Sequence, residues 1–442
     1  MTTRRPVHEG SPVSSRLRLV DGSGTILHRS LSMCRSHHRY LLSTRWRLSL
    51  LLWLVTTGSL WGGDRLVVEV RETGGWSRPV YPCTLQLDRP ATARRPQFRL
   101  LDEQARPVVL QVDAQPQGKR VRWWLAFSVT LAPFQRRVFS LEVGPAVRPG
   151  PRRERGHAVK ATDTRLQVIN APYLTWSIPR RVGPFLQSLE FGGHEHLRGP
   201  TARLELKDRG GRSYQLGGPQ AKRWRLVRKG PLAVTLAGDS SVTPAGRDAV
   251  ASHVELDFPV SRSWVRLDWS LDDANDEIAE ASLVVDLNLD PPRSGVPTLA
   301  DFGAGTWVYA RLAAGQAALL ESGTRGGAPR WRVLQGREGN LRPLVVARPG
   351  GHEAAEGWTH LMDRTRCLAL AVGQFGDEQA DSIRTTAEGR VTVRRVFTKR
   401  SVTNRRPKRL RAWLHFVGFP PQQAAATSPR HMQTPPLVRI VP

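Results

Sequence analysis

The sequence predicts an all-β fold, because apolar side chains recur with a period of two and turn residues interrupt the chain. Between residues 121 and 131 every odd position is apolar. The same alternation recurs in residues 253–260, 264–271 and 282–289. The 39 glycines and 33 prolines fall between such stretches at turn-like intervals, which is typical of β-sandwiches and β-barrels.

Helical spacing is almost absent from the sequence. The one helix-like stretch covers residues 311–322, and Gly315 interrupts it. It also follows the strand-like run TWVYA. Two interpretations therefore stay open for this stretch, a short helix or two strands.

Residues 1–63 are predicted to be an N-terminal extension and a secretory signal. Two arginines precede an apolar run from Leu48 to about Trp61, and small residues follow in a zone suited to cleavage. The run is short for a membrane span, so a retained signal anchor is only the alternative. Met33 opens a more conventional signal peptide and is an alternative start. We expect a secreted, periplasmic or cell-envelope protein, which meets a membrane only if the signal is uncleaved.

The remaining chain is predicted to hold two β units. Residues 64–146 form the small unit and residues 164–419 the large one. Between them, in residues 147–163, the alternation stops and Pro, Gly and Arg take over, as in a linker. Residues 420–442 are rich in Pro, Gln, Ala and Thr, and we expect a disordered tail there.

The three cysteines predict no obligatory disulfide. Cys34 leaves with the signal, and Cys83 and Cys367 lie in the small and the large unit. An oxidising compartment would permit a pair, but the separation of the two residues into different units favours two unpaired thiols.

The chain is strongly basic, and nearly all of its positive charge is arginine. Lys and Arg total 66 against 38 Asp and Glu, a formal net charge of +28, and only seven of the cations are lysine. Two causes fit this skew: a GC-rich genome, which encodes arginine wherever lysine would do, and attraction to a polyanion. Because export makes nucleic acid a poor partner, the expected partner is an acidic polysaccharide and no nucleic acid.

Motifs in both units follow the pattern of one protein family. In the small unit the matching residues are Asp102, Arg106, Pro107, Val108, Gln111, Gly118, Val121, Arg122 and Trp123. Ala105 stands where that family has a turn glycine. In the large unit the matching stretches are LQVINAPYLTWSIP, LQSLEFGGHEHL, WRLVRKGPLAVTLAGD, WVRLDWSLDD, EGWTHLMDRTRCLALAVGQF and RLRAWLHFVGFP. These motifs resemble those of the exo-rhamnogalacturonan lyase-like family. The resemblance implies a small N-terminal RIFT-type β-barrel followed by a large antiparallel β-supersandwich of galactose-mutarotase-like shape.

The resemblance also implies a further domain, an α/α toroid, that this sequence does not contain. In that family the two β domains precede an α/α toroid, whereas this sequence ends at Pro442 with a composition like that of the linker into the toroid. If the lyase site lies at or near the toroid, the chain is not a complete lyase by itself, and a separate α/α-toroid polypeptide is an expected partner. No cofactor motif is identified, and calcium stays open because many lyases use it.

The stretch LEFGGHEHL places His194, Glu195 and His196 directly behind two glycines. On a strand the two histidines would share one face and supply two ligands of a zinc site, but no other histidine is nominated by its spacing. A hairpin turn is the favoured interpretation, ahead of contact with a sugar, and no metal ligand is assigned. Replacing either histidine by alanine is expected to leave folding and metal content unchanged.

Trp358 and His360, in GWTHL, are the other candidate substrate-binding residues. An exposed Trp on a sheet can stack on a pyranose ring, whereas a Trp in an alternating strand is usually core. Trp358 follows a glycine in an expected loop; for Trp413, in RAWLHF, core is favoured. Nothing in the sequence forms a catalytic triad or a spaced carboxylate pair, so no catalytic residue is assigned.

Three functions fit these observations. The first is a secreted, carbohydrate-associated β protein that acts as a binding or accessory module for an acidic, uronate-containing polysaccharide. The second is a truncated or split exo-polysaccharide lyase that cleaves a rhamnogalacturonan-like glycan by β-elimination. The third is a non-catalytic structural protein of the envelope.

Overall fold

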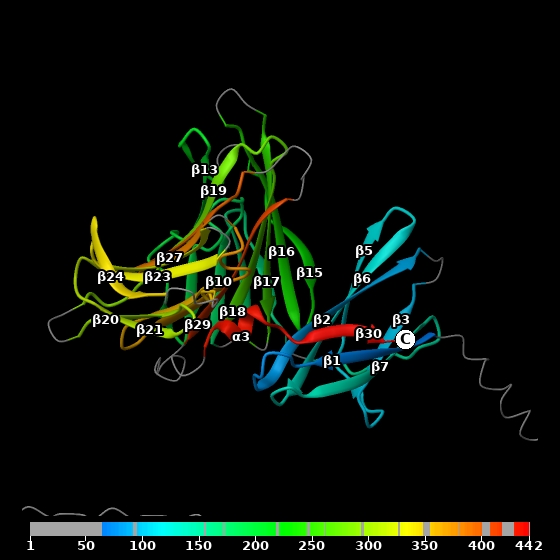
Figure 1. Cartoon of the computed structure of the whole chain (residues 1–442). Coiled ribbons are helices and arrows are strands. Elements are labelled where there is room, and N and C mark those ends of the chain that lie inside the picture. The colour runs from blue at the N-terminus through cyan, green and yellow to red at the C-terminus, as the bar shows by residue number, and fades with distance from the viewer. Residues whose placement is uncertain are drawn as a thin grey trace, which may run out of the picture. The chain divides into compact units, whose positions relative to one another are not determined.

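The computed structural model describes residues 64–91, 95–153, 156–170, 173–217, 221–244, 248–260, 262–292, 296–325, 328–347, 354–378, 380–399, 407–417 and 428–441. The predicted signal and the Met33 alternative lie outside these ranges. In the described ranges strands predominate and every strand pairing is antiparallel, which confirms the all-β prediction (Figure 1). No helix in these ranges is long and apolar enough to cross a bilayer.

Two sheets enclose the N-terminal core. The first, in spatial order, contains β30 (Leu437–Val441), β1 (Asp64–Arg71), β7 (Arg136–Gly144), β3 (Gln97–Leu101) and β4 (Pro107–Val108). The second contains β2 (Arg78–Pro90), β6 (Arg120–Leu131) and β5 (Gln111–Gln117). Their apolar side chains meet around Trp123, Phe127 and Phe139. In the described residues no ladder joins the two sheets, so this part is a pair of sheets and not the closed barrel that we expected.

Three further sheets build the large part of the chain. A five-stranded sheet contains β12 (His194–Glu195), β11 (Ser188–Phe191), β10 (Leu174–Pro179), β9 (Arg165–Asn170) and β8 (Ala158–Ala161). An eight-stranded sheet contains β14 (Ser213–Gln215), β13 (Arg203–Asp208), β19 (Ile278–Asp286), β28 (Arg390–Val396), β27 (Ala380–Thr386), β22 (Gln316–Arg325), β23 (Ala328–Arg337) and β24 (Asn340–Val346). A nine-stranded sheet contains β15 (Arg225–Lys229), β16 (Ala233–Val242), β17 (Val250–Pro259), β18 (Trp264–Asp272), β29 (Lys408–Val417), β26 (Cys367–Val372), β25 (Trp358–Met362), β20 (Thr298–Gly303) and β21 (Trp307–Leu312). The predicted alternating stretches become β6, β17, β18 and β19, and one large hydrophobic core lies among the three sheets.

The helix-like stretch at residues 311–322 consists of strands. β21 ends at Leu312 in the nine-stranded sheet and β22 begins at Gln316 in the eight-stranded sheet. Gly315, at φ +71°, lies in the turn between them, where a residue with a Cβ atom would be strained. The two-strand interpretation is therefore confirmed.

Cys83 and Cys367 lie in different hydrophobic surroundings. Cys83 belongs to the N-terminal core, whereas Cys367 begins β26. Both are free thiols, and burial raises the pKa of both. A high pKa leaves little reactive thiolate at neutral pH.

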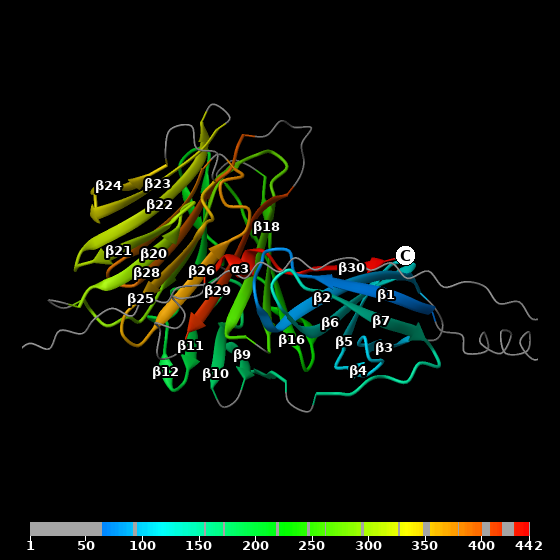
Figure 2. The same cartoon turned by 60° about the horizontal axis from the view of Figure 1, so that its bottom comes forward.

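The expected linker and the expected tail both contain ordered structure. Within the linker range, residues 158–161 form β8. The tail forms helix α3 (Arg430–Gln433) and β30, so the predicted disorder is wrong for residues 428–441. β30 pairs with β1 along its whole length, and Val438 and Ile440 pack against the N-terminal core. Both views show β30 beside β1 (Figures 1 and 2).

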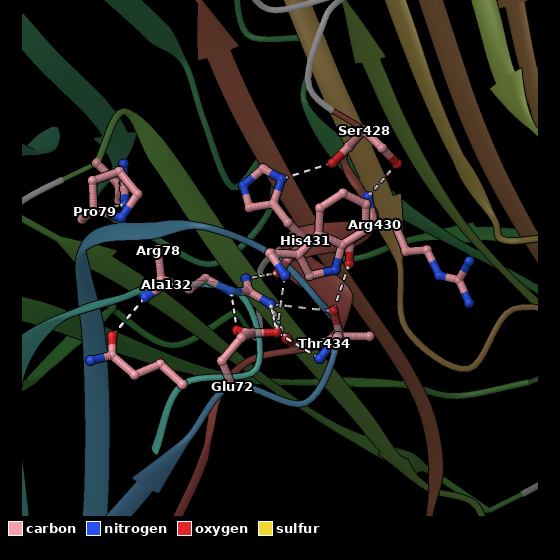
Figure 3. A network of polar contacts seen from close by, with 12 residues as sticks. Glu72, Arg78, Pro79, Ala132, Ser428, Arg430, His431 and Thr434 are labelled. Carbon is pink, nitrogen blue, oxygen red and sulfur yellow. Dashed lines mark hydrogen bonds and ion pairs between the residues drawn. The ribbon is translucent and has the colours of Figure 1, made fainter. Parts of the chain in front are cut away.

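Arg78 anchors this C-terminal segment through a buried network (Figure 3). Its guanidinium pairs with Glu72, Nε to Oε2 at 2.5 Å, and donates to the backbone oxygens of His431 and Thr434. The side chain of Gln433 donates to three backbone oxygens, including that of Val372 at 2.7 Å. The same four residues, 431–434, are thus tied both to β2 of the N-terminal sheets and to β26 of the nine-stranded sheet.

Candidate functional site

The stretch LEFGGHEHL forms the hairpin between β11 and β12. Gly192 and Gly193 both have positive φ, +59° and +78°, which a tight two-residue hairpin turn requires. Glu190 pairs with Glu195, and Phe191 pairs with His194. The hairpin interpretation is confirmed.

The three polar side chains of this hairpin point to three different environments. His194 is exposed. The Glu195 carboxylate accepts hydrogen bonds from the backbone N–H groups of Leu189 and Leu197, both at 2.9 Å, and so fixes the turn. His196 is 2% exposed, and this burial, with the positive charge of Arg366, lowers its pKa to about 4.

This arrangement does not gather metal ligands. In the described residues no group of three or more His, Cys, Asp or Glu side chains is placed to hold a metal ion. The ring of His196 packs against Phe416 at a centroid distance of 6.2 Å, edge to face. The expectation that His196→Ala leaves folding unchanged is therefore corrected, because the exchange would empty a buried site.

Trp358 and His360 belong to two rows of side chains that cross one face of the nine-stranded sheet. One row, set by the strand registers, is Trp264, His415, Ala369, His360, Asp301 and Tyr309. The next is Arg266, Trp413, Ala371, Trp358, Gly303 and Trp307. We call these two rows the Trp–His face. Successive strand residues point to opposite faces, so His415 belongs to this face and Phe416, which contacts His196, to the other.

Small residues in the rows make room for the large rings. A Cβ atom on Gly303 would collide with the indole of Trp358. The Trp358 ring meets Trp307 edge to face at 5.2 Å and lies 5.6 Å from His360. The alternation of small and large side chains therefore packs these rings densely.

The Asp301 carboxylate organises the centre of the face. Its Oδ1 accepts the backbone N–H of His360 at 2.9 Å and lies 2.8 Å from Nδ1 of the same residue, while Oδ2 accepts Nε1–H of Trp307 at 2.9 Å. Because a carboxylate only accepts, Nδ1 of His360 carries a proton and donates it to Asp301. Nε2 has no hydrogen-bond partner among the described residues.

The C-terminal segment covers this centre. Met432 is fully buried and packs with Trp264, Trp358 and Trp413 in a small hydrophobic cluster. Trp358 is 1% and His360 0% exposed, so neither candidate presents a ring face to solvent. Sequence reasoning placed Trp358 in a loop because nothing in the local pattern shows that residues 428–441 return to this face.

One end of the Trp–His face is open. The rings of Trp307 and Tyr309 are parallel, with an interplanar angle of 10° and a centroid distance of 5.9 Å. Tyr309 is 66% exposed and lies on β21, an edge strand of the nine-stranded sheet. Sequence reasoning missed this pair, although its spacing of two residues on a strand predicts a shared face.

A second polar site was also missed. A pocket of about 570 Å³ has lining residues that include Arg95, Gln111, Trp123, Arg152, Arg153 and Lys229, and we call it the basic pocket. Two of these arginines belong to the range that we interpreted as a linker. The arginine run in residues 152–155 was the available signal, but its partners come from distant parts of the chain.

Comparison with known proteins supports the fold. No protein-family model and no curated protein sequence matches this chain. An α-mannosidase from Enterococcus faecalis V583 matches with a TM-score of 0.53 and 10% identity, over 86% of this chain and 46% of that protein. A glycosyl hydrolase family 38 protein from Enterococcus faecalis gives the same TM-score, 0.53, and identity, 10%, over 86% of this chain and 47% of its own. A galactose mutarotase-like protein from Clostridium acetobutylicum matches at a TM-score of 0.33 and 6% identity, over 60% of this chain and 98% of that one.

The likenesses to the two Enterococcus proteins concern the fold alone. The chain spans less than half the length of the two Enterococcus proteins that it resembles. It shares a β architecture with them at 10% identity, so no family membership follows. The resemblance to the exo-rhamnogalacturonan lyase-like family stays a prediction.

Proposed function

We propose that this protein is a secreted or cell-envelope module that binds an acidic polysaccharide, alone or as an accessory to an enzyme. The fold shared with an α-mannosidase supports an association with carbohydrate. The excess of positive charge in residues 64–442, with 57 Lys and Arg against 36 Asp and Glu, supports an acidic partner. A separate α/α-toroid polypeptide would supply any lyase chemistry.

The observation that carries the proposal is the exposed Tyr309 ring, which lies parallel to the half-buried ring of Trp307. Trp307 lies parallel to it, and Trp307 is itself fixed by the 2.9 Å hydrogen bond to Asp301. A rigid aromatic ring on an edge strand offers an apolar face to the C–H face of a pyranose. The contact with Trp307 restricts the Tyr309 ring, which reduces the conformational entropy that is lost when a sugar stacks on it.

The enzyme alternative has weaker support in the described residues. Within the Trp–His face, the group best suited to acid–base chemistry is the His360 imidazole, oriented by Asp301. That imidazole is fully buried beneath the C-terminal segment, whereas Tyr309 is open to solvent. Binding is for this reason the function that we propose.

The test is calorimetric titration of the full chain with oligogalacturonate, rhamnogalacturonan fragments and a neutral galactan. Tyr309→Ala should weaken binding of an acidic glycan about tenfold, the factor that corresponds to about 1.4 kcal/mol. The matched control is Tyr173→Ala, because Tyr173 is 68% exposed, like Tyr309, but lies in the turn before β10. Equal affinities for both variants would remove Tyr309 from the binding site, and a wild-type chain that binds none of the glycans would refute the function.

A further inference from the structure

We propose that the basic pocket is the subsite that holds the carboxylate-bearing residues of the polysaccharide. This inference rests on the proposed function and deepens it by assigning a second site, apart from the Tyr309 ring. The pocket volume, about 570 Å³, lies within the range of about 300–1,000 Å³ that is usual for small-ligand pockets, which is roomy enough for a sugar residue.

The charge of the pocket is strongly one-sided. Four of its lining residues are cations, Arg95, Arg152, Arg153 and Lys229. All four are exposed, and none of them forms an ion pair with a described residue. The nearby carboxylate of Asp113, which interacts with Arg95, is occupied by the side-chain amide of Gln111 at 2.7 Å. The lining residues of the pocket thus include four cations and no carboxylate.

The floor of the pocket is rigid. The Gln111 carbonyl oxygen accepts the backbone N–H groups of Leu232 at 3.0 Å and Ala233 at 2.9 Å, and its amide donates to the Ala233 oxygen at 3.1 Å. Gln111 is 4% exposed. A Cβ atom on Gly230 would collide with the Gln111 side chain, so the turn between β15 and β16 can approach β5 this closely only with glycine there. The cations of the rim therefore surround a preformed hollow.

Arginine recognises planar carboxylates through paired, charge-assisted hydrogen bonds, and the rim supplies three guanidinium groups. Single-stranded nucleic acid, another polyanion, is usually held by bases stacked on exposed aromatic rings. The aromatic rings here offer no such platform, because Trp123 is 4% exposed and Arg95 lies 5.6 Å above its ring. The pocket thus suits a uronate better than a nucleobase.

The experiment compares two double variants of the full chain that each lose two positive charges. Arg152→Gln with Arg153→Gln alters the rim of the pocket, and Arg330→Gln with Arg342→Gln alters exposed arginines of β23 and β24. Each is titrated with oligogalacturonate, with its methyl ester and with a single-stranded DNA oligomer. Thermal unfolding checks that both variants fold, and Lys229→Gln is a second pocket variant that leaves residues 152 and 153 unaltered.

We expect the pocket variant to bind oligogalacturonate about 10 to 100-fold more weakly than wild type, because each lost charged contact corresponds to roughly a tenfold change. The control variant should stay within about threefold, and the methyl ester should bind wild type as weakly as the acid binds the pocket variant. If wild type binds the acid but both double variants bind it alike, the pocket is not the subsite, although the proposed function stands. If the pocket variant loses DNA binding and keeps glycan binding, the site serves nucleic acid and the inference fails. If wild type binds no glycan, both this inference and the proposed function fail.

Discussion

The Arg78 guanidinium and the Glu72 carboxylate form a 2.5 Å ion pair in which the two side chains are 1% and 0% exposed. Removing one partner of such a pair leaves a buried charge without a counterion. Arg78→Met should therefore lower the free energy of unfolding by about 3–5 kcal/mol. Urea unfolding followed by tryptophan fluorescence measures this loss.

The control for this prediction is Arg122→Met. Arg122 pairs with Asp88, but the two side chains are 33% and 43% exposed. A pair open to water contributes little, so Arg122→Met should change the free energy of unfolding far less than Arg78→Met. Similar losses for the two variants would show that the Arg78 network does not anchor the C-terminal segment.

Met432 should be the main apolar anchor of residues 428–441. Met432→Ala would leave a cavity among Trp264, Trp358 and Trp413, and we expect a loss of about 2–5 kcal/mol with a red shift of tryptophan emission. Leu437→Ala in the same segment, where Leu437 is 45% exposed, should change stability by less than about 0.5 kcal/mol. An unshifted emission spectrum for Met432→Ala would contradict the burial of the tryptophans under this segment.

Ala105 has φ +56°, a left-handed conformation that a Cβ atom makes costly. Ala105→Gly should raise the free energy of unfolding by about 0.5–1 kcal/mol, since the relief of strain exceeds the extra freedom of glycine in the unfolded chain. Ala114→Gly, in the exposed part of β5, should lower it by a similar amount because that backbone is extended. Chemical unfolding of both variants checks the opposite signs.

Stability should fall as the solution becomes acidic. His196 has a pKa of about 4 in the folded protein, against a usual value of 6.5, chiefly because it is buried. Its contribution is complete above pH 6.5, where both states are neutral, and is lost as the pH falls from 6.5 to 4, since only the unfolded chain takes up the proton. The total for this residue is up to about 3 kcal/mol, and His157 and His431 act in the same direction.

Urea unfolding between pH 4 and 7 measures this effect. His196→Gln should make the dependence on pH shallower by about one proton. Phe191→Leu disturbs the same packing without removing a titrating group, so it should lower stability equally at every pH. If His196→Gln has the slope of the wild type, another group is responsible.

The long strands could be predicted from the sequence. In a strand of ten residues with one buried face, apolar and polar side chains alternate over enough positions to be recognised. β30 could not be predicted with the same means. It has only five residues. Its two inward residues, Val438 and Ile440, pack against the N-terminal core only because β30 pairs with β1. The preceding residues are rich in Pro and Gln, a composition that predicted disorder instead of a strand.

The sequence predicted which residues of the candidate site lie together, but it did not predict that they are buried. Trp358 and His360 do lie together, on one face and beside Asp301, as a shared strand predicts. Their burial depends on Met432, which comes from a segment with no local relation to them. The basic pocket could not be predicted for a similar reason. Arg152 and Lys229 line the same pocket only because β5 lies close to the turn after β15.

The pairing of β1 with β30 also has a consequence for biosynthesis. Arg439 reaches Glu69 across 370 positions of the chain, so the first described strand must wait for the last one to leave the ribosome. Until then one side of β1 is an unpaired edge, able to accept a strand from another nascent chain. Translation would therefore deliver the nine-stranded sheet before the N-terminal sheets can close, and a chaperone that shields β1 during synthesis would raise the yield of native protein.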